Sequence, residues 1–544
     1  MAAIDKELKE SLGKAAQKAL DVEVNPQEIV IEIPKRKEQG DFSSNLAMQL
    51  TKQLKRNPRE IAAAIVESFE DPIVEKIEIA GPGFLNFTLK KDRYAEVVEE
   101  VLSKGADFGT LKPNGIKVNV EYVSANPTGS LHLGHARGAA WGDALTRIMK
   151  KAGYDVTREY YVNDAGNQIR NLALSVQARY LQALGKEAEI GKDGYNGADV
   201  KEFGAALAEK YGDKFAEDTE ENLNFFRKEG IQFELDKIKR DLGRYRVGFD
   251  VWSSEQKLRD DHEVEAVLEK LDEKGYLYEN DGAMWFRSTD FNDDKDRVLK
   301  KQDGSFTYLV PDIAYHNNKY QRGYDLMVDL FGADHHGYIP RLKGSMAALG
   351  NDPDKLNVDI IQMVRLVQDG KEVVMSKREG NATTIVELMD WVGTDAARYF
   401  FVARALDSHL DFDLGLAKSQ TNDNPVFYAQ YAHARMASIL KAAADLPKPE
   451  NYNGLVHEKE IELMKALQEY ENVIAETART RQVHRMTHYI QSLASKFHSF
   501  YTVCKVNDPA NPELSAQRMA LVKAAKTVLA SALDLIGVDA PESM

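Results

Sequence analysis

Residues 118–145 of the chain read VNVEYVSANPTGSLHLGHARGAAWGDAL and contain, in order, a candidate strand, a loop and a helix. The first seven residues form a largely apolar run, which is typical of a buried strand. The proline and glycines that follow indicate a loop, and the alanine-rich remainder has the periodicity of a helix. A strand that leads through a loop into a helix is the repeating unit of a parallel sheet covered by helices. The stretch therefore predicts an α/β fold with a Rossmann-like parallel sheet.

The same alternation of strands and helices recurs downstream. A strand pattern at 325–331 (DLMVDLF) precedes a helical pattern, and a further strand pattern covers 358–367 (VDIIQMVRLV). We therefore expect one α/β domain over residues 113–415. Charged residues are much denser within 201–300 than the 29% average of the chain, which favours helices with solvated faces over strands of a central sheet. An inserted module is accordingly predicted at about residues 195–290.

Two further domains flank the α/β domain. Residues 1–112 mix helical and strand patterns, which predicts a small N-terminal α+β domain. Its helices are expected at Ile4–Leu20 and Asn45–Phe69, and its strands within Val22–Lys35 and Val74–Lys90. Residues 416–544 show helical periodicity almost throughout, which predicts an all-α bundle.

The composition excludes several classes of protein. The 544 residues include 71 Lys plus Arg and 86 Asp plus Glu, a formal net charge of −15 that argues against indiscriminate binding of nucleic acids. No apolar run approaches the ~18 residues of a membrane span, and the start, MAAIDKELKE, is charged, so we expect a cytoplasmic protein that does not enter a membrane. The single cysteine, Cys504, excludes disulfides within the chain and zinc sites built on several thiolates.

Two histidines mark the start of the predicted helix. His132 and His135 bracket Leu133 and Gly134. A helix N-terminus favours bound phosphate, because it offers free backbone N–H groups and the positive end of the helix dipole, and Gly134 lets a ligand approach the backbone. Imidazoles three residues apart share one helix face and can donate hydrogen bonds to charge that develops on a transferring phosphoryl group. The alternative is that both histidines only cap the helix or pack in the core.

A second candidate site is the segment VQDGKEVVMSKREGN at 367–381, a polar loop between glycines that follows a strand pattern. A lysine on such a loop can reach the β and γ phosphates of a nucleotide. Taken alone, Lys377 would be read as a solvated side chain. Its occurrence together with the histidine motif favours the functional interpretation.

These two motifs resemble those of the class I aminoacyl-tRNA synthetases, a His-x-Gly-His segment after the first strand and a Lys-Met-Ser-Lys loop after the last. The resemblance extends over the whole chain to the arginyl branch of the family, in its bacterial type. It rests on the segments GDFSSNLAMQL, GPGFLNF, VEYVSANPTGSLHLGH, REYYVNDAGNQI, DGSFTYLVPDIAYH, FGADHHGYIPRL, SHLDFDL and NPVFYAQYAHAR. The first Lys of the loop is Val374 here, which leaves Met375, Ser376 and Lys377 for the ATP site.

The resemblance implies a two-step reaction that uses ATP, Mg²⁺, L-arginine and the tRNA for arginine. The arginine carboxylate would attack the α-phosphate of ATP to give an adenylate and pyrophosphate, and the acyl group would then pass to the terminal ribose of the tRNA. By motif, His132 and His135 would stabilise the pentacovalent phosphate and Lys377 the departing pyrophosphate. Gly134 would lie against the adenine or ribose. The complete motif would comprise Ala125, Asn126, Pro127, Thr128, Gly129, Ser130, Leu131, His132, Leu133, Gly134 and His135.

The choice of amino acid can be argued from residue chemistry as well. A guanidinium has five fixed donors and needs carboxylates or carbonyls and an aromatic wall. The resemblance assigns Tyr308 and Asp312 to the guanidinium side, and an Asn with a Glu to the amino-acid side. The predicted arginine-binding set is Glu121, Ser124, Asn126, Tyr308, Asp312 and His335. Each of these residues, taken singly, also fits a structural role.

The vicinal His335 and His336 suggest a metal site at first. Adjacent residues of an extended segment point in opposite directions, however, which is poor geometry for chelation. We therefore predict no metal held by protein side chains, and the resemblance places this segment beside the amino acid and the ribose instead.

The flanking domains would bind tRNA. The bundle resembles the anticodon-binding domain of the family, the N-terminal domain resembles the module that contacts the tRNA elbow, and aromatic residues with amide and basic partners suit unstacked bases. The predicted tRNA-binding residues are Phe84, Asn86, Tyr428, Gln430, Tyr431 and Arg435. The aromatic pair in the bundle has helical spacing and could pack in its core instead. A monomer is expected.

Three alternatives stay open. A small-molecule nucleotidylyltransferase shares the histidine motif but not the flanking domains. Another class I synthetase would share the mechanism but not the amino acid. A non-catalytic tRNA-binding relative would have no need for His132, His135 and Lys377 together.

Overall fold

A computed structural model describes residues 2–32, 34, 36–373, 383–442 and 448–544. At its centre is a five-stranded parallel sheet with the spatial order β12-β11-β5-β6-β7. Its strands are β5 (Lys117–Glu121), β6 (Asp155–Val162), β7 (Val251–Ser254), β11 (Leu326–Gly332) and β12 (Leu356–Ile361). The chain builds the sheet outward from β5 to one edge and then, starting at β11, to the other. Ligands bind at the carboxyl ends of the strands at such a reversal. The predicted Rossmann-like sheet is confirmed.

Helix α6 (Leu133–Lys151) packs closely on this sheet. A Cβ at Gly142 would lie 2.3 Å from the ring of Tyr122, so only glycine lets the helix approach the end of β5 this closely. The other elements around the sheet are α12 (Leu309–Gln321), α13 (Ile339–Leu349), β13 (Val364–Gln368), β14 (Lys371–Glu372), α14 (Ile385–Val392), α15 (Thr394–Val402), β15 (Leu410–Asp413) and α16 (Leu414–Lys418).

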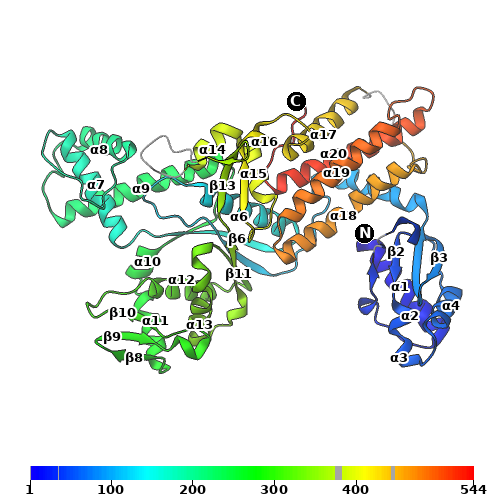
Figure 1. Cartoon of the computed structure of the whole chain (residues 1–544), viewed down its shortest axis with the longest axis horizontal. Helices are drawn as coiled ribbons and strands as arrows, with labels where there is room; N and C mark the ends of the chain where they lie inside the picture. The colour runs from blue at the N-terminus through cyan, green and yellow to red at the C-terminus, as the bar shows by residue number, and fades with distance from the viewer. Residues whose placement is uncertain (1, 33, 35, 374–382, 443–447) are drawn as a thin grey trace.

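Two lobes project from the sheet (Figure 1). One is helical, with its own apolar core, and consists of α7 (Asn167–Ala183), α8 (Ala198–Tyr211) and α9 (Glu220–Arg244). The other packs an antiparallel sheet against α12 and α13 and adds α10 (Glu255–Asp260), α11 (Glu263–Glu273), β8 (Leu277–Asn280), β9 (Ala283–Phe286) and β10 (Arg297–Lys300).

The charged stretch at 195–290 differs from its prediction. It contains β7, a strand of the central sheet, and the pair β8 and β9, and not helices alone. The strand β7 is only four residues long, lies at an edge and is half-buried, so it needs few apolar residues. A charge average over a long window therefore could not reveal it.

The N-terminal domain is built on a four-stranded antiparallel sheet of order β1-β2-β4-β3. Its elements are α1 (Ala2–Leu20), β1 (Ile31–Glu32), β2 (Phe42–Ser44), α2 (Leu46–Gln49), α3 (Thr51–Leu54), α4 (Pro58–Ser68), β3 (Val74–Ala80), β4 (Phe84–Leu89) and α5 (Glu96–Lys104). The helix predicted at Asn45–Phe69 is broken, because Lys55 adopts a φ of 51° and Pro58 starts a new helix. The strand predicted within Val22–Lys35 is reduced to the two residues of β1 among those described.

The C-terminal domain is the predicted helical bundle. Its helices are α17 (Pro425–Ala442), α18 (Glu458–Thr480), α19 (His484–Val503) and α20 (Pro512–Leu535). It is fastened to the sheet domain by Arg398, which is fully buried and donates to Asp143 Oδ2 at 2.6 Å and to the carbonyl of Ile536 at 3.0 Å. The bundle lies between the sheet and the N-terminal domain (Figure 1). Over the described residues, every helix is too short or too polar to cross a membrane.

Candidate functional site

A cleft of about 750 Å³ opens where the strand order reverses, at the carboxyl ends of β5, β11 and β12. The start of α6 forms one wall, and the segment 361–364 between β12 and β13 forms another. Of the residues predicted from the sequence, the cleft brings together Ser124, His132, Leu133, Gly134, His135 and His335.

His132 and His135 cap helix α6. The Nδ1 atom of His132 accepts a hydrogen bond from the backbone N–H of Gly134 at 3.2 Å, and the Nδ1 atom of His135 accepts one from the backbone N–H of His132 at 3.2 Å. Because each Nδ1 is an acceptor, the proton of each neutral ring lies on Nε2. The capping alternative and a functional role are therefore compatible, since Nδ1 holds the helix while Nε2–H stays a donor.

Both imidazoles are neutral at neutral pH. Burial lowers the pKa of His132, and burial together with the neighbouring His132 lowers the pKa of His135 to about 3. Their ring centroids lie 3.7 Å apart, so a proton on one ring disfavours a proton on the other. The pair can thus offer N–H donors to an anion without taking up a proton from solvent.

The loop after β5 is strained. Val123 has a φ of 72° and Ser124 a φ of 40°, a region that a β-branched residue rarely adopts. The turn brings Ser124 Oγ back to within 2.9 Å of Glu121 Oε1, to which it donates, and the same Oγ accepts from the backbone N–H of Tyr161 at 3.1 Å. The strain therefore fixes a hydroxyl at the edge of the cleft, and the sequence gives no sign of it, since valine is not a turn residue.

Glu121 is buried at the end of β5. The Nζ atom of Lys319 lies 2.5 Å from Glu121 Oε2 and 2.8 Å from Asp329 Oδ1. Glu121, His316 and Asp329 lie close enough together to hold a metal ion, but the ammonium group of Lys319 already bridges the two carboxylates. The cluster is an ion-pair network, and the absence of a protein-bound metal stays a prediction.

Asp312 lies on α12 and accepts a hydrogen bond from the hydroxyl of Tyr338 at 2.5 Å. Burial raises the pKa of Asp312 to about 6, although this hydrogen bond opposes the shift. Tyr308 is 85% exposed at the start of α12, so the structure does not bring its ring into a pocket with Asp312. The role of Tyr308 stays a prediction.

Two tyrosines that the sequence did not indicate form an aromatic wall near the carboxylates of Glu255 and Asp312. Tyr161 and Tyr315 are buried, with ring centroids 4.4 Å apart, and Tyr161 donates to Glu255 Oε2 at 3.0 Å. Burial raises the pKa of Tyr161, and the charges of Glu255 and Asp312 add to the shift. The wall comes from β6 and α12, which are far apart in sequence.

Arg137 is a second residue that sequence reasoning missed. It is fully buried on α6 and donates to the carbonyls of Gln362, Ala405 and Ser408, each at 2.8 Å. Burial lowers its pKa to about 10. Because Gln362 lines the cleft, Arg137 ties the wall at 361–364 to the helix that carries the two histidines.

The predicted loop residues Met375, Ser376 and Lys377 lie outside the described residues. The chain re-enters the described part next to the histidines, since the backbone N–H of Ile385 donates to the carbonyl of Leu131 at 2.8 Å and Thr384 forms a β-bridge with His132. The segment that follows the loop is therefore anchored beside the histidines.

The other predicted residues differ in how exposed they are and in what they contact. Asn126 is exposed and donates to Gln168 Oε1 at 2.8 Å at the rim of the site. Asn86 is only 6% exposed and accepts from Ser43 Oγ at 2.7 Å, so it is not presented to a partner, whereas Phe84 is partly exposed. The amide of Gln430 donates to Asp395 Oδ2 at 2.8 Å and thus joins domains.

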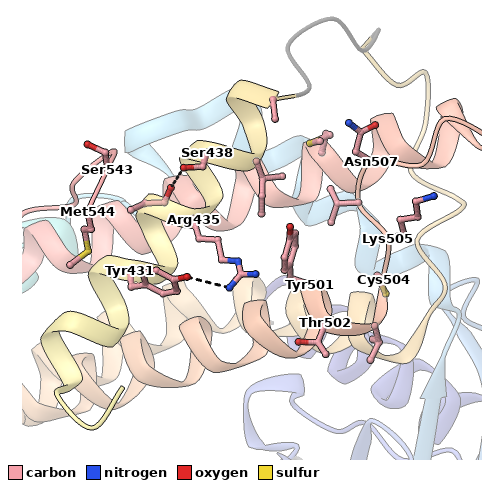
Figure 2. A pocket seen from close by; sticks show the side chains of 16 residues that line it. Tyr431, Arg435, Ser438, Tyr501, Thr502, Cys504, Lys505, Asn507, Ser543 and Met544 are labelled. Atoms are coloured by element: carbon pink, nitrogen blue, oxygen red, sulfur yellow. Dashed lines mark hydrogen bonds between the residues drawn. The ribbon is translucent and has the colours of Figure 1, made fainter. Parts of the chain in front are cut away.

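A second cleft, of about 870 Å³, lies in the bundle (Figure 2). Arg435 extends between two tyrosines: its guanidinium lies 4.6 Å from the ring centroid of Tyr501 and 5.9 Å from that of Tyr431. Tyr428 packs on His498 outside this cleft, with ring centroids 5.0 Å apart. Of the predicted tRNA-binding residues, Tyr431 and Arg435 therefore face this cleft together.

The chain matches family models over most of its length. The matches are to the Arginyl tRNA synthetase N terminal domain over residues 6–89, the catalytic domain of tRNA synthetases class I (R) over 97–401, and the DALR anticodon binding domain over 429–544.

Curated relatives and solved structures agree with these models. The chain is 54% identical to an arginine--tRNA ligase of Anoxybacillus flavithermus and 52% identical to one of Bacillus subtilis, in each case over 99% of this chain and 98% of the relative. The arginyl-tRNA synthetase of Thermus thermophilus superimposes with a TM-score of 0.75 over 99% of both chains at 21% identity, which shows the shared fold.

Proposed function

Because the chain belongs to the arginyl-tRNA synthetases, which attach L-arginine to tRNA with ATP, we propose that both steps of this reaction take place in the cleft beside His132. The observation that supports this location most is the pair of neutral imidazoles at the start of α6. No nucleophilic Ser or Cys is needed, since the reaction depends on positioning and on stabilisation of charge.

In the first step, the arginine carboxylate attacks the α-phosphate of ATP, the P–O bond to pyrophosphate breaks, and arginyl-adenylate forms. Negative charge grows on the phosphoryl oxygens in the transition state. The Nε2–H groups of His132 and His135 are donors already fixed by the capping hydrogen bonds, so no reorganisation is needed when the charge develops. Lys377 would neutralise the departing pyrophosphate, and Met375 and Ser376 would complete the ATP site.

Mg²⁺ would enter with ATP and supply charge neutralisation on its phosphates. Among the described residues that line the cleft, Asp334 carries the only carboxylate. Mg²⁺ keeps several waters and binds through one or two carboxylates together with substrate phosphates, so this donor set fits an ion carried by ATP and does not fit a cage of protein ligands.

For arginine, we propose that Asp312 binds the guanidinium and that Glu121, with Ser124 and Asn126, binds the α-ammonium. The two carboxylates lie on α12 and at the end of β5, and α12 contacts β5 through the ion pair of Lys319 with Glu121. His335 and Tyr308 belong to the proposed site as well, and the closure of Tyr308 over arginine would need its ring to move from its exposed position.

The full chain, assayed with ATP, Mg²⁺ and total tRNA, is expected to charge tRNA with arginine alone among the twenty amino acids. Chelation of Mg²⁺ is expected to stop the reaction and its replacement to restore it. Charging by a different amino acid would contradict the assignment of arginine as the substrate. Release of pyrophosphate without arginine would contradict the reaction proposed for the cleft. Pyrophosphate exchange, measured with and without tRNA, then reports whether tRNA is needed to form the adenylate.

We propose that residues 416–544 bind the anticodon and that the cleft at Arg435 takes an unstacked base. A guanidinium held between two tyrosine rings can stack on a base and still donate to its edge. The N-terminal domain, residues 1–112, would contact the tRNA elbow through Phe84, and residues 113–415 would be the catalytic domain. We also propose that the protein is a monomer and acts in the cytoplasm.

An Arg435→Met variant is expected to raise the KM for tRNA by about tenfold, because stacking and charge on one base are lost. The KM for arginine should not change, as the bundle cleft is separate from the sheet cleft. Aminoacylation at varied tRNA concentration measures this. Arg479→Met, a matched change at an exposed arginine of the same bundle, is the control; equal effects in both variants would argue against a base-binding cleft.

A further inference from the structure

Three carboxylates lie side by side on neighbouring strands of the central sheet. In the parallel register, Glu121 of β5 is paired with Glu159 of β6 on one side and with Asp329 of β11 on the other. Directly paired residues point to the same face and are only about 5 Å apart. All three are buried, so their mutual repulsion is poorly screened. We call Glu159, Glu121 and Asp329 the acid row.

Side chains of helix α12 and of its C-cap residue balance this row. His316, Lys319 and Arg322 are spaced three residues apart and so lie along one face of the helix. Arg322 pairs with Glu159 at 2.8 Å, and Nε2 of His316 lies 2.7 Å from Asp329 Oδ2. The outer two carboxylates of the row thus have partners of their own.

Lys319 is shared between the central and one outer carboxylate. Its Nζ atom donates to Glu121 Oε2 and to Asp329 Oδ1, and it lies 4.5 Å from the ring centroid of Tyr315. The side chain is fully buried, so it does not touch a substrate. The other oxygen of Glu121, Oε1, accepts from Ser124, which lines the cleft. Lys319 therefore holds the Oε2 atom of Glu121 from the buried side, while the Oε1 atom lies on the side of Ser124 and the cleft.

We propose that Lys319 is a positioning residue for arginine binding: by bridging Glu121 and Asp329 it holds the Glu121 carboxylate in place, with Oε1 turned to the α-ammonium of arginine. This rests on the proposed assignment of Glu121 to the arginine site. Without the bridge, two adjacent buried carboxylates would repel each other, and the Glu121 side chain would turn away from this position. Lys319 thus acts through Glu121 and not on the substrate.

The first test is Lys319→Met, which keeps the length of the side chain and removes its charge. The KM for arginine in tRNA-supported pyrophosphate exchange is expected to rise at least about tenfold, with the KM for ATP unchanged and kcat at saturating arginine less affected. As a control, Arg297→Met removes a cation shared by Asp293 and Asp294 in the lobe of β10, away from the cleft, and should leave the arginine KM unchanged.

The second test restores the balance of charge. In Asp329→Asn, Lys319 keeps its contact with Glu121 and the repulsion from the neighbouring carboxylate is lost, so the arginine KM should stay close to the wild-type value. In Lys319→Met/Asp329→Asn, Glu121 no longer faces a charged neighbour at residue 329, so the KM should lie closer to the wild-type value than that of Lys319→Met alone. A thermal melt reports whether each variant folds, and Asp329→Asn, which keeps the contact between Lys319 and Glu121, tests the proposal even if Lys319→Met does not fold.

Additive effects of the two substitutions on the arginine KM, or equal changes in the KM for ATP, would show a purely structural role and overturn the proposal. Glu121→Gln separates this failure from failure of the site itself. If Glu121→Gln raises the arginine KM and Lys319→Met does not, the inference about Lys319 is wrong and the arginine site stands. If Glu121→Gln has no effect, the assignment of Glu121 is wrong.

Discussion

A His132→Asn variant is expected to form arginyl-adenylate about 10² to 10³ times more slowly than the wild-type enzyme while folding equally well. Asparagine is among the best N-cap residues, and its side-chain oxygen can accept from the N–H of Gly134 as Nδ1 of His132 does. It is too short to place a donor where Nε2–H lies. The substitution therefore separates the two functions of the ring, capping and donation.

Single-turnover formation of the adenylate, with saturating ATP, arginine and tRNA, measures the effect. The KM for arginine should change little, because the lost hydrogen bond forms in the transition state. His132→Ala is the matched variant that also loses the cap, which costs about 1 kcal/mol of stability. If His132→Asn were as active as wild type, the histidines would only cap the helix.

Replacing Asp312 by Asn is expected to raise the KM for arginine by about a hundredfold, because a charged hydrogen bond to the guanidinium becomes a neutral one in a buried site. The maximal rate should fall less than the affinity, since the reacting carboxylate lies at the other end of arginine. Pyrophosphate exchange at varied arginine concentration gives both values. A wild-type KM would exclude Asp312 from the guanidinium pocket.

The pH dependence of the wild type provides a second readout of this role. Burial raises the pKa of Asp312 to about 6, so the carboxyl becomes neutral, and arginine binding weakens, as the pH falls through about 6. Tyr338→Phe removes the hydrogen bond that opposes this shift and should move the midpoint to higher pH. In Asp312→Asn this step should be absent. A pH profile of KM that is identical in all three proteins would contradict the assignment.

Much of the fold could be predicted from local patterns. The strand, loop and helix at 118–145 became β5 and α6 as expected, and the bundle and the N-terminal α+β domain have the predicted classes. The boundaries that failed depend on single residues or on context: Lys55 breaks a helix through its own φ, and β7 exists because β6 offers it an edge. Such effects are too small for an average over a window to detect.

The site was predictable only as far as its motifs reach. Ser124, His132 and His135 could be found because they are close in sequence, and the structure brings them into one cleft. Lys319 and Arg137 could not be found, since Lys319 acts on Glu121, about 200 residues away, Arg137 holds carbonyls more than 200 residues away, and each looks like an ordinary charged residue of a helix. The distinction between Asn86 and Phe84, one buried and one partly exposed, likewise requires the fold.

The reversal of the strand order also determines when during synthesis the site can exist. Strand β5 pairs with β6 soon after both emerge, but its other neighbour, β11, follows much later, and Arg137 finds Ser408 only 271 residues downstream. At about 5–20 residues per second, that interval lasts roughly 15–55 s. For most of it, until β11 has been made, the edge of β5 that will carry Asp329 beside Glu121 has no partner, and unpaired strand edges are the sites at which nascent chains associate wrongly. The ribosome-bound chain is therefore inactive, and most open to misassembly, until the second half of the sheet has been made.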